Sequence, residues 1–543
     1  MLSVPELQHL NVSLQKQLSI PIEEKNGDRM YSKCRIYNLN YSAISVDEML
    51  ATNYTNITTK TCDKWEYDRS VMKTTVMSEY DLVCEGSWLS SLAGTALMIG
   101  LFFGAISSGF LSDKFGRKVT TLAIGVLHIV SAFSAAFAPN YIVFLTLRTI
   151  AGMTAIGVYT PYWLLLIEAC PPTHRGYMTI LTDALLRVGT GSLALVAWLL
   201  RDHWLLQIIG AIGMVPGLIL FVIFVPESPR WLISVGRVAD AEAISRKIAK
   251  WNREEIPASF SLKQVEEKDD ASSEKKGTFF DLFRTPNLRK YTLVVCSYWF
   301  ACVFGNYAMD LNVGTLIPGS IFLNYLLMST MVPLVSCISL FIGIQKIPRV
   351  VSLPGFLGVG GVMCIAMAPI LLTNIPQLVT TVACIGRMLL ANAFSLIYLY
   401  SGEIFPTPLR NVGLGAGSSF GRIGGLITPQ IYLLASVWFG LPYVVLGGIP
   451  LGAALLSLML PETRGIRLPE NLSDGELFGT SAYEDITSND RSGEKDNGTA
   501  LVDSDGERAF INNAFHMDTN AKSTKPELVK PDKAMTLNDV TSL

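Results

Sequence analysis

Apolar runs of about 20 residues, separated by short polar connectors, fill most of residues 87–460. We expect each run to form a helix that crosses a bilayer, because about 20 apolar residues span the roughly 30 Å hydrocarbon core. The runs fall into two groups on either side of a polar stretch. The first group is 87–111, 119–138, 141–166, 177–200 and 204–225, and the second is 289–309, 319–345, 350–372, 376–400, 411–434 and 438–460.

This pattern predicts an all-α membrane protein with eleven spans arranged in two lobes. The expected divisions are a polar N-terminal segment 1–86, a first transmembrane lobe 87–231, a central loop 232–288, a second transmembrane lobe 289–460 and a tail 461–543. The tail is rich in Asp, Ser, Asn and Gly, so we expect it to be disordered.

The distribution of Lys and Arg predicts the orientation in the membrane. Basic residues gather in alternate connectors, such as the one with Lys114, Arg117 and Lys118, while connectors such as 139–140 are nearly free of them. The basic connectors are expected on the cytosolic side, together with the central loop and the tail. The N-terminal segment then lies outside the cell and the protein is a multi-pass protein of the plasma membrane.

The N-terminal segment has the chemistry expected outside the cell. It carries four Asn-x-Ser/Thr sequons, which predict glycosylation at Asn11, Asn40, Asn53 and Asn56. It also carries three cysteines, Cys34, Cys62 and Cys84. Disulfides form on the same side of the membrane as glycosylation, and an odd number leaves at least one thiol without a partner inside the segment.

Composition excludes several functions. Half of the 543 residues are hydrophobic, only 16% are charged, and the formal net charge is −2, so nothing favours nucleic-acid binding. We find no His/Cys spacing for a metal, no nucleophile–base arrangement and no phosphate-binding loop. We therefore expect no enzyme activity, no metal, no cofactor and no ATP-driven pumping.

Four charged residues recur in the same register in both lobes. Moving along the chain by 235 residues carries one set onto the other. The sets are Glu168, Arg175, Arg187 and Glu227, and Glu403, Arg410, Arg422 and Glu462. Such internal similarity in a membrane protein indicates two homologous halves, and binding sites lie where such halves meet.

Several separated motifs narrow the fold. The segment Gly109-Phe-Leu-Ser-Asp-Lys-Phe-Gly-Arg-Lys118 resembles the signature between the second and third helices of the major facilitator superfamily. The segments around Cys62-Asp-Lys-Trp-Glu66, Pro226-Glu-Ser-Pro-Arg-Trp-Leu232 and Tyr400-Ser-Gly-Glu-Ile-Phe-Pro406 resemble the organic cation, organic anion and carnitine transporter family. The resemblance covers about residues 60–465. It implies twelve helices in two lobes that rock about a central site, and the first of those helices has no counterpart in this sequence.

Arg422 is the first candidate for a substrate contact. It lies about a dozen residues into its span, where a charged side chain usually faces a cavity. The positions one turn away are Ser418 and Leu426, so no acid lies beside it on the same helix. An unpaired guanidinium suits a carboxylate, which it binds in a bidentate fork. The resemblance implies that Arg at this position belongs to members that handle anions and carnitine. A structural pairing with an acid on another helix is the alternative.

Arg187 and a group of aromatic residues complete the predicted site. Asp183 lies four residues before Arg187, which favours an ion pair between the two side chains. If that pair opens, Arg187 becomes a second positively charged side chain for the substrate. The aromatic candidates are Tyr159, Tyr162, Trp163, Tyr298, Trp299, Tyr307, Phe394, Tyr398 and Tyr400. Of these, Tyr159, Trp163, Tyr307 and Tyr398 are the best placed to line a cavity, while any single one could instead be a packing residue.

Charged residues at the predicted cytosolic helix ends are interpreted as a gate. They are Asp113, Arg117, Glu168, Arg175, Glu227, Glu403, Arg410 and Glu462. Such charges can pair in one conformation and separate in another. A solvated loop face is the alternative.

The sequence thus predicts a transporter of small organic ions in the lipid bilayer that works by alternating access. Anions or zwitterions such as carnitine-like compounds are favoured and organic cations are a further option. The alternative is a non-transporting regulatory or partner-binding membrane protein that lacks the first helix, and a neutral-sugar carrier is a weaker third. The final residues Thr541-Ser542-Leu543 fit a ligand for a PDZ domain.

Overall fold

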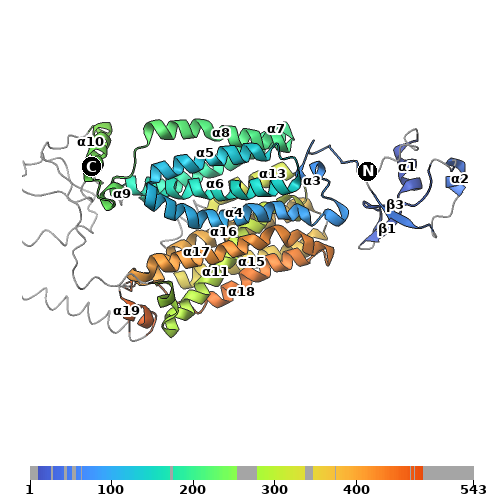
Figure 1. Cartoon of the computed structure of the whole chain (residues 1–543). Coiled ribbons are helices and arrows are strands. Elements are labelled where there is room, and N and C mark those ends of the chain that lie inside the picture. The colour runs from blue at the N-terminus through green and yellow to red at the C-terminus, as the bar shows by residue number, and fades with distance from the viewer. Residues whose placement is uncertain are drawn as a thin grey trace, which may run out of the picture.

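Long helices run side by side in one bundle in the computed structural model of the chain (Figure 1). The structure describes residues 10–253, 278–336, 347–480 and 483. Short gaps within these ranges are 26–27, 42–43, 45, 52–56, 63, 171–174, 374, 465, 467 and 470. The N-terminal segment lies beyond one end of the bundle, and α9, α10 and α19 lie at the other end.

Both groups of apolar runs form helices close to the predicted bounds. The first lobe contains α4 (Leu89–Phe115), α5 (Arg117–Ala135), α6 (Tyr141–Ala169), α7 (Arg175–Leu200) and α8 (His203–Phe224). The second contains α11 (Pro286–Leu311), α13 (Ile321–Leu326) continued by the π-helix η5 (Leu327–Met331), α15 (Arg349–Leu371), α16 (Pro376–Ile404), α17 (Arg410–Ile427) continued by the 3-10 helix η7 (Thr428–Ser436), and α18 (Leu441–Ser457).

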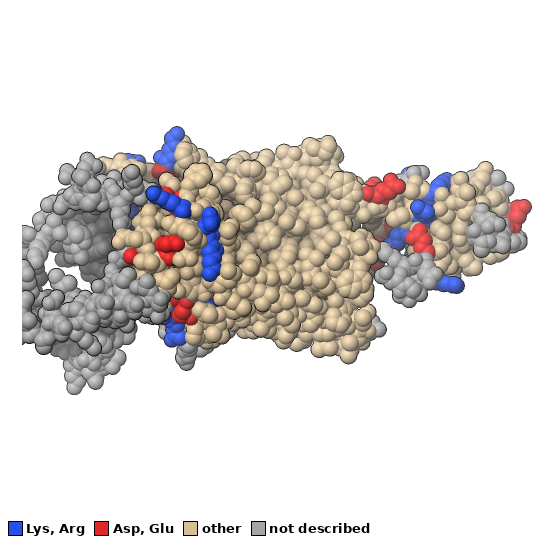
Figure 2. Space-filling view, turned by 90° about the horizontal axis from the view of Figure 1, so that it is seen from below, with Lys and Arg blue, Asp and Glu red and all other residues tan. Residues whose placement is uncertain are grey.

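Eight of the described helices are long and apolar enough to cross a membrane, and two apolar helices, Ile321–Ser336 and Leu441–Ser457, are shorter. The remaining predicted span corresponds to α17, which is rich in glycine and carries Arg422. Figure 2 shows the result on one face of the molecule, where charged side chains gather towards the ends and uncharged residues cover the band between them. An uncharged band of this kind suits the hydrocarbon core of a bilayer.

Glycine residues let α4 and α6 cross at very short distance. A Cβ atom added to Gly100 would lie 2.1 Å from the Thr149 carbonyl oxygen, and one added to Gly152 would lie 2.4 Å from the Leu97 carbonyl oxygen. Small residues are the usual means of close packing between membrane helices, because lipid provides no hydrophobic driving force for association. The first lobe is therefore held by backbone-to-backbone contact.

The second lobe has a large buried core centred on α11. Tyr298, Trp299, Phe304 and Tyr400 are all almost completely buried there. In the most apolar stretch of α11, 72% of the residues are buried, against 6% for α7 in the first lobe. The two lobes therefore repeat a sequence pattern but differ in how much of each helix faces its surroundings.

The N-terminal segment forms a small folded unit, which the sequence pattern did not predict. It contains α1 (Val12–Ser19), α2 (Val46–Ala51) and two antiparallel two-stranded sheets. The strands are β1 (Ile22–Lys25) paired with β2 (Asp28–Tyr31), and β3 (Arg35–Tyr37) paired with β4 (Thr59–Thr61). A disulfide joins Cys34 to Cys84, and Leu18 and Met49 form a small core. The bridge ties this unit to the chain just before α4.

A polar clasp also holds the chain against the end of the bundle. Thr74 donates to Asp202 over 2.6 Å, and the same hydroxyl accepts from the backbone N–H of His203 over 3.3 Å. The two ring nitrogens of His203 lie 3.1 Å from the Thr74 hydroxyl and 2.6 Å from Glu79.

Shorter elements lie mainly at the ends of the bundle. They are α3 (Val76–Glu79), η3 (Cys84–Gly86), α9 (Pro229–Ser234), α10 (Val238–Asn252), η4 (Phe279–Phe283), α12 (Val313–Leu316), η6 (Thr407–Leu409) and α19 (Leu472–Leu477). We expected disorder from residue 461 onwards, and the start of the tail differs from that. Glu476 of α19 accepts from the backbone of Asn287, and Tyr291 donates to the Phe478 carbonyl over 2.9 Å.

Several predicted features lie outside the described residues. These are the sequon asparagines Asn53 and Asn56, the side chain of Arg175 and the C-terminal residues 541–543. The other two sequon asparagines, Asn11 and Asn40, are exposed on the N-terminal unit.

Candidate functional site

Arg422 projects from the middle of α17 and is half-buried. Within the described part of the chain, no ion pair joins Arg422 to a carboxylate. Arg422 therefore has no ion-pair partner on its own helix or on the other helices, as far as the structure describes them.

Arg187 lies at the equivalent position of the first lobe and has a different environment. Its guanidinium forms an ion pair with Asp183 of the same helix, with an N–O distance of 3.4 Å. Both side chains are partly exposed, at 26% and 32%. The predicted i,i+4 pair is therefore present. The Nε of Arg187 is buried with no hydrogen-bond partner among the described residues, so the pair does not satisfy the whole guanidinium.

Three tyrosines connect these two arginines across the lobes. Tyr307 of α11 interacts electrostatically with both Arg422 and Arg187. Tyr398 of α16 lies within electrostatic range of Arg422 and of Tyr159 of α6. Electrostatic interactions therefore link five of the six predicted substrate contacts across the two lobes.

The other aromatic candidates divide into two groups. Trp299 donates from its ring N–H to Ser401 over 3.0 Å and packs edge-on against Tyr398, with ring centroids 4.4 Å apart. Phe394 lies on the same cluster, 5.3 Å from the Tyr398 ring. In contrast, Tyr298 and Tyr400 are buried and donate to backbone carbonyl oxygens, and Tyr162 packs against Phe221 on the α8 side. The last three are packing residues in this conformation.

The aromatic positions obey the same internal repeat as the charges. An offset of 235 residues carries Tyr159 onto Phe394 and carries Trp163, the sixth predicted contact, onto Tyr398. Each lobe thus places two aromatic residues one helical turn apart, on α6 and on α16. Trp163 is half-buried.

A buried ion pair beside these residues was missed by the sequence analysis. Arg387 of α16 donates to both carboxylate oxygens of Asp310 of α11, from Nε over 3.1 Å and from Nη2 over 2.9 Å. Its remaining nitrogen donates to Asn306. Arg387 is only 3% exposed and Asp310 is 24% exposed. The signal in the sequence was the presence of charged residues inside or at the edge of two apolar runs.

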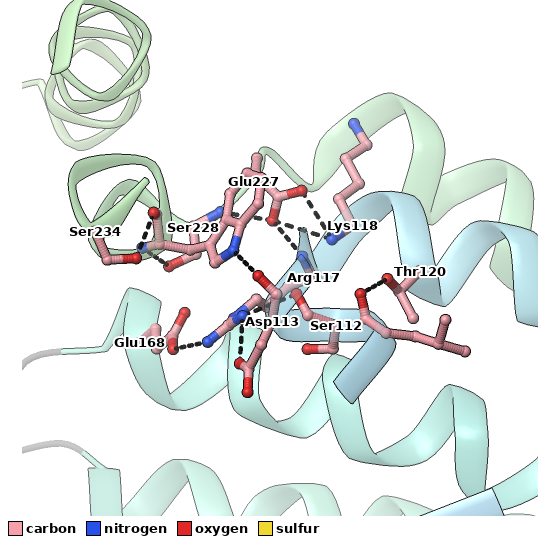
Figure 3. Close-up of polar contacts among 11 residues, drawn as sticks. Ser112, Asp113, Arg117, Lys118, Thr120, Glu168, Glu227, Ser228 and Ser234 are labelled. Carbon is pink, nitrogen blue, oxygen red and sulfur yellow. Dashed lines mark hydrogen bonds and ion pairs between the residues drawn. The ribbon is translucent and has the colours of Figure 1, made fainter. Parts of the chain in front are cut away.

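Charged residues at the end of the first lobe near α9 form one cluster (Figure 3). Arg117 lies 2.8 Å from Asp113 and 3.3 Å from Glu168. Glu227 accepts from the first backbone N–H groups of α5, those of Arg117 and Lys118. A carboxylate at this place also complements the helix dipole. Gly116 makes the turn possible, because its φ of +101° is unfavourable for other residues.

The second lobe repeats this cluster. Arg349, which begins α15, lies 3.4 Å from Glu403 of α16. Glu462 accepts from the backbone N–H groups of Arg349 and Val350 at the start of α15, and also from Thr463 and Arg464. Burial alone would raise the pKa of Glu462, but these N–H groups hold it below the usual value. Arg349, which was not among the predicted gate residues, is the ion-pair partner of Glu403.

These clusters pair charges within each lobe, whereas several contacts between the lobes lie between the middle of the bundle and its opposite end. Ser90 of α4 hydrogen-bonds Tyr432 of η7, and Thr190 of α7 lies 3.3 Å from Thr330 of η5. Gly94 of α4 packs directly against Pro429. The lobes are therefore joined at the predicted extracellular end in this conformation.

Comparison with known proteins gives consistent matches over most of the chain. The family model described as "Sugar (and other) transporter" matches residues 44–471. Solute carrier family 22 member 21 of Mus musculus is 31% identical over 485 residues, which are 87% of this chain and 84% of that protein. The organic cation transporter protein of Drosophila melanogaster is 34% identical over 456 residues, 82% of each chain. Organic cation/carnitine transporter 2 of Mus musculus is 32% identical over 466 residues, 84% of this chain and 82% of that one.

Among solved structures, the inward-open xylose transporter XylE of E. coli matches with a TM-score of 0.56. The two sequences are 19% identical, and the match covers 74% of this chain and 91% of that one. At this identity the similarity shows the fold, which is the two-lobe helical bundle.

Proposed function

We propose that this member of solute carrier family 22 carries small organic anions or zwitterions. The chain belongs to that family, the organic cation and carnitine transporters of the major facilitator superfamily. Members of this family are transporters of small organic ions and not enzymes. The finer question is the charge of the substrate, and the surroundings of Arg422 support a carboxylate.

The single observation that carries the proposal is that no carboxylate among the described residues forms an ion pair with Arg422. A charged side chain at mid-membrane costs about 2.5–3.5 kcal/mol on insertion scales, so a position that holds one without a partner needs a functional reason. A substrate carboxylate supplies the missing charge and accepts two parallel N–H bonds. A neutral sugar would leave that charge unpaired.

The tyrosines supply the rest of the recognition. Tyr307 and Tyr398 lie within electrostatic range of Arg422, and Tyr159 of the other lobe lies within electrostatic range of Tyr398. A flat organic body stacks on such rings, and the ammonium group of a zwitterion meets their negative faces. We assign Trp163 to the same wall, because it lies one helical turn from Tyr159.

The charged clusters act as the gate in this proposal. In the present conformation the lobes are joined at the predicted extracellular end, and Arg117 and Arg349 are paired within their own lobes. The substrate then enters or leaves from the cytosolic side. When the lobes rock, Arg175, Arg410 and the cluster carboxylates exchange partners across the lobe boundary, which biases the equilibrium between the two states.

The orientation follows from the same proposal and has its own test. With the N-terminal unit outside the cell, Asn11 and Asn40 are accessible for glycosylation. Replacing the four sequon asparagines by Gln is then expected to increase electrophoretic mobility to that of enzymatically deglycosylated protein. Unchanged mobility of the natural protein on deglycosylation would contradict this orientation.

The central experiment is a radiolabelled uptake panel in cells. Carnitine, a quaternary ammonium compound and an aromatic carboxylate are compared for the natural protein and for Arg422→Ala, each normalised to the amount of protein at the cell surface. We expect carboxylate uptake to be lost in the variant. Arg237→Ala serves as a matched control, because Arg237 lies on α10 with 59% of its side chain exposed. Undiminished carboxylate uptake by Arg422→Ala would overturn the proposal.

A further inference from the structure

An apolar groove runs along the second lobe, separate from the arginine site. Its volume is about 760 Å³, within the usual range for small-molecule sites. Its walls carry phenylalanines that include Phe300 of α11, Phe420 of α17 and Phe283 of η4. Phe102 of α4 also lines it, so the groove touches both lobes.

Glycine residues, which have no side chain, leave open space along the floor of the groove. A Cβ atom added at Gly415, Gly448 or Gly452 would meet nothing within 4 Å, although all three residues line the groove. Side chains at these positions would fill the space, and their absence leaves a channel between α17, α18 and α11. Such a channel, within the uncharged band of the bundle, fits a hydrocarbon chain.

The cytosolic mouth of the groove is basic. The face of α11 that lines it contains Leu293, Cys296, Ser297 and Phe300, which follow helical spacing. One turn earlier on the same face lie Arg289 and Lys290. Both are exposed, and no ion pair joins either of them to a described carboxylate.

Nearby acidic groups are already engaged. Glu476 of α19 accepts from the backbone N–H groups of Asn287 and Leu288. Asp281 caps η4 by accepting from Thr278. Lys290 lies over the Tyr291 ring, 6.0 Å from its centroid, and neither Glu476 nor Asp281 forms an ion pair with Arg289 or Lys290, so both cations can meet an anionic ligand at the mouth.

We propose that this groove binds an anionic phospholipid of the cytosolic leaflet. One acyl chain lies between Phe300, Phe420 and the glycine floor, and the phosphate lies at Arg289 and Lys290. Exposed Phe280, next to the mouth, enters the interface beside the lipid. Apolar burial of the chain and attraction between the basic residues and an anionic headgroup act together at such sites. Contact with Phe102 makes the bound lipid favour the present arrangement of the lobes.

The test measures lipid retained by the full-length protein. Protein is purified from nanodiscs that contain phosphatidylserine and phosphatidylcholine in equal amounts, and bound lipid is counted by native mass spectrometry. We expect phosphatidylserine to exceed phosphatidylcholine in the natural protein. Arg289→Glu with Lys290→Glu is expected to reduce bound phosphatidylserine about tenfold. The matched control Lys250→Glu, an exposed charge reversal on α10, is expected to leave it unchanged.

A second variant tests the groove itself. Gly452→Phe fills the channel and is expected to reduce retention of both lipids, whereas Gly355→Phe, at a glycine of α15 that also has open space beside it, is not. Equal retention of the two lipids by the natural protein would overturn the proposal, as would unchanged phosphatidylserine in the charge-reversal variant or in Gly452→Phe. If the charge-reversal protein fails to fold, the double variant Arg289→Gln with Lys290→Gln is measured instead. A loss of bound phosphatidylserine is again expected, and unchanged phosphatidylserine would again overturn the proposal.

Discussion

The two lobes place an arginine at the same position of the repeat, and the two arginines differ in one neighbour. Arg187 has Asp183 four residues before it and forms an ion pair, while Arg422 has Ser418 at the equivalent place. The fold therefore provides the position twice, and in the proposed function a single neighbouring residue decides whether the charge is paired within the protein or meets a substrate.

The two lobes also contribute different net charge to the site. The first lobe contributes one arginine and one aspartate, Arg187 and Asp183. The second lobe contributes Arg422 in addition to the Arg387–Asp310 pair. The surplus positive charge of the described site therefore comes from the second lobe, and substitutions there are expected to have the larger effects.

The largest effect is expected from Asp310→Asn, which leaves Arg387 buried without a carboxylate. Removing one member of a buried ion pair typically destabilises a protein by about 3–5 kcal/mol. We expect a clear fall in the thermal unfolding midpoint of the purified protein. The double variant Asp310→Leu/Arg387→Met is the control and is expected to recover much of the loss. Equal instability of the single and double variants would contradict the assigned pairing.

The next largest effect is expected from Ser418→Asp, which copies the first lobe's arrangement into the second. The new carboxylate lies four residues before Arg422 and competes with the substrate for it. Uptake of carboxylates is expected to fall at least tenfold, or about 1.4 kcal/mol. Ser418→Asn replaces the hydroxyl by a side chain of similar size to Asp without adding charge, so it separates the effect of the new charge from the effect of the new side chain. A similar fall in both variants would argue against competition for Arg422.

A smaller effect is expected at the gate, where Glu462 and Glu227 occupy equivalent places. Glu462→Gln weakens hydrogen bonds to the start of α15 and is expected to lower stability by about 1 kcal/mol at neutral pH. Because the pKa of Glu462 is lowered in the folded protein, its contribution is present above the ordinary pKa and is lost as the pH falls through the lowered one.

Thermal unfolding of the natural protein and Glu462→Gln across this pH range checks that sign. The difference between them is expected to vanish at acid pH, and Glu227→Gln provides the comparison from the other lobe. A difference that grows on acidification would contradict the assignment.

The smallest effect is expected from Asp183→Asn, which removes the carboxylate that forms the ion pair with Arg187. A partly exposed i,i+4 pair contributes only about 0.3–0.5 kcal/mol, so the change is about twofold. We expect the ratio of dicarboxylate to monocarboxylate uptake to rise by that factor. Asp183→Glu keeps the charge and is expected to leave the ratio unchanged. A falling ratio in Asp183→Asn would show that Arg187 does not face the substrate.

Features that depend on local spacing were predictable from the sequence, and features that depend on packing were not. Apolar runs located the helices, and the i,i+4 spacing of Asp183 and Arg187 gave a pair that the structure contains. The Arg387–Asp310 pair joins residues 77 apart on two helices, so only the packing of α11 against α16 creates it. Six of the eight residues proposed as a gate were identified from the repeat, yet the partners of the described ones depend on how the helix ends meet.

The most direct measurement compares binding of a carboxylate and its methyl ester to purified protein, with Arg or Gln at position 422. The compound is the carboxylate of the uptake panel that the natural protein carries best. We predict that the natural protein prefers the acid over the ester by more than tenfold and that Arg422→Gln binds both equally. A preference for the acid that persists in Arg422→Gln would contradict the account.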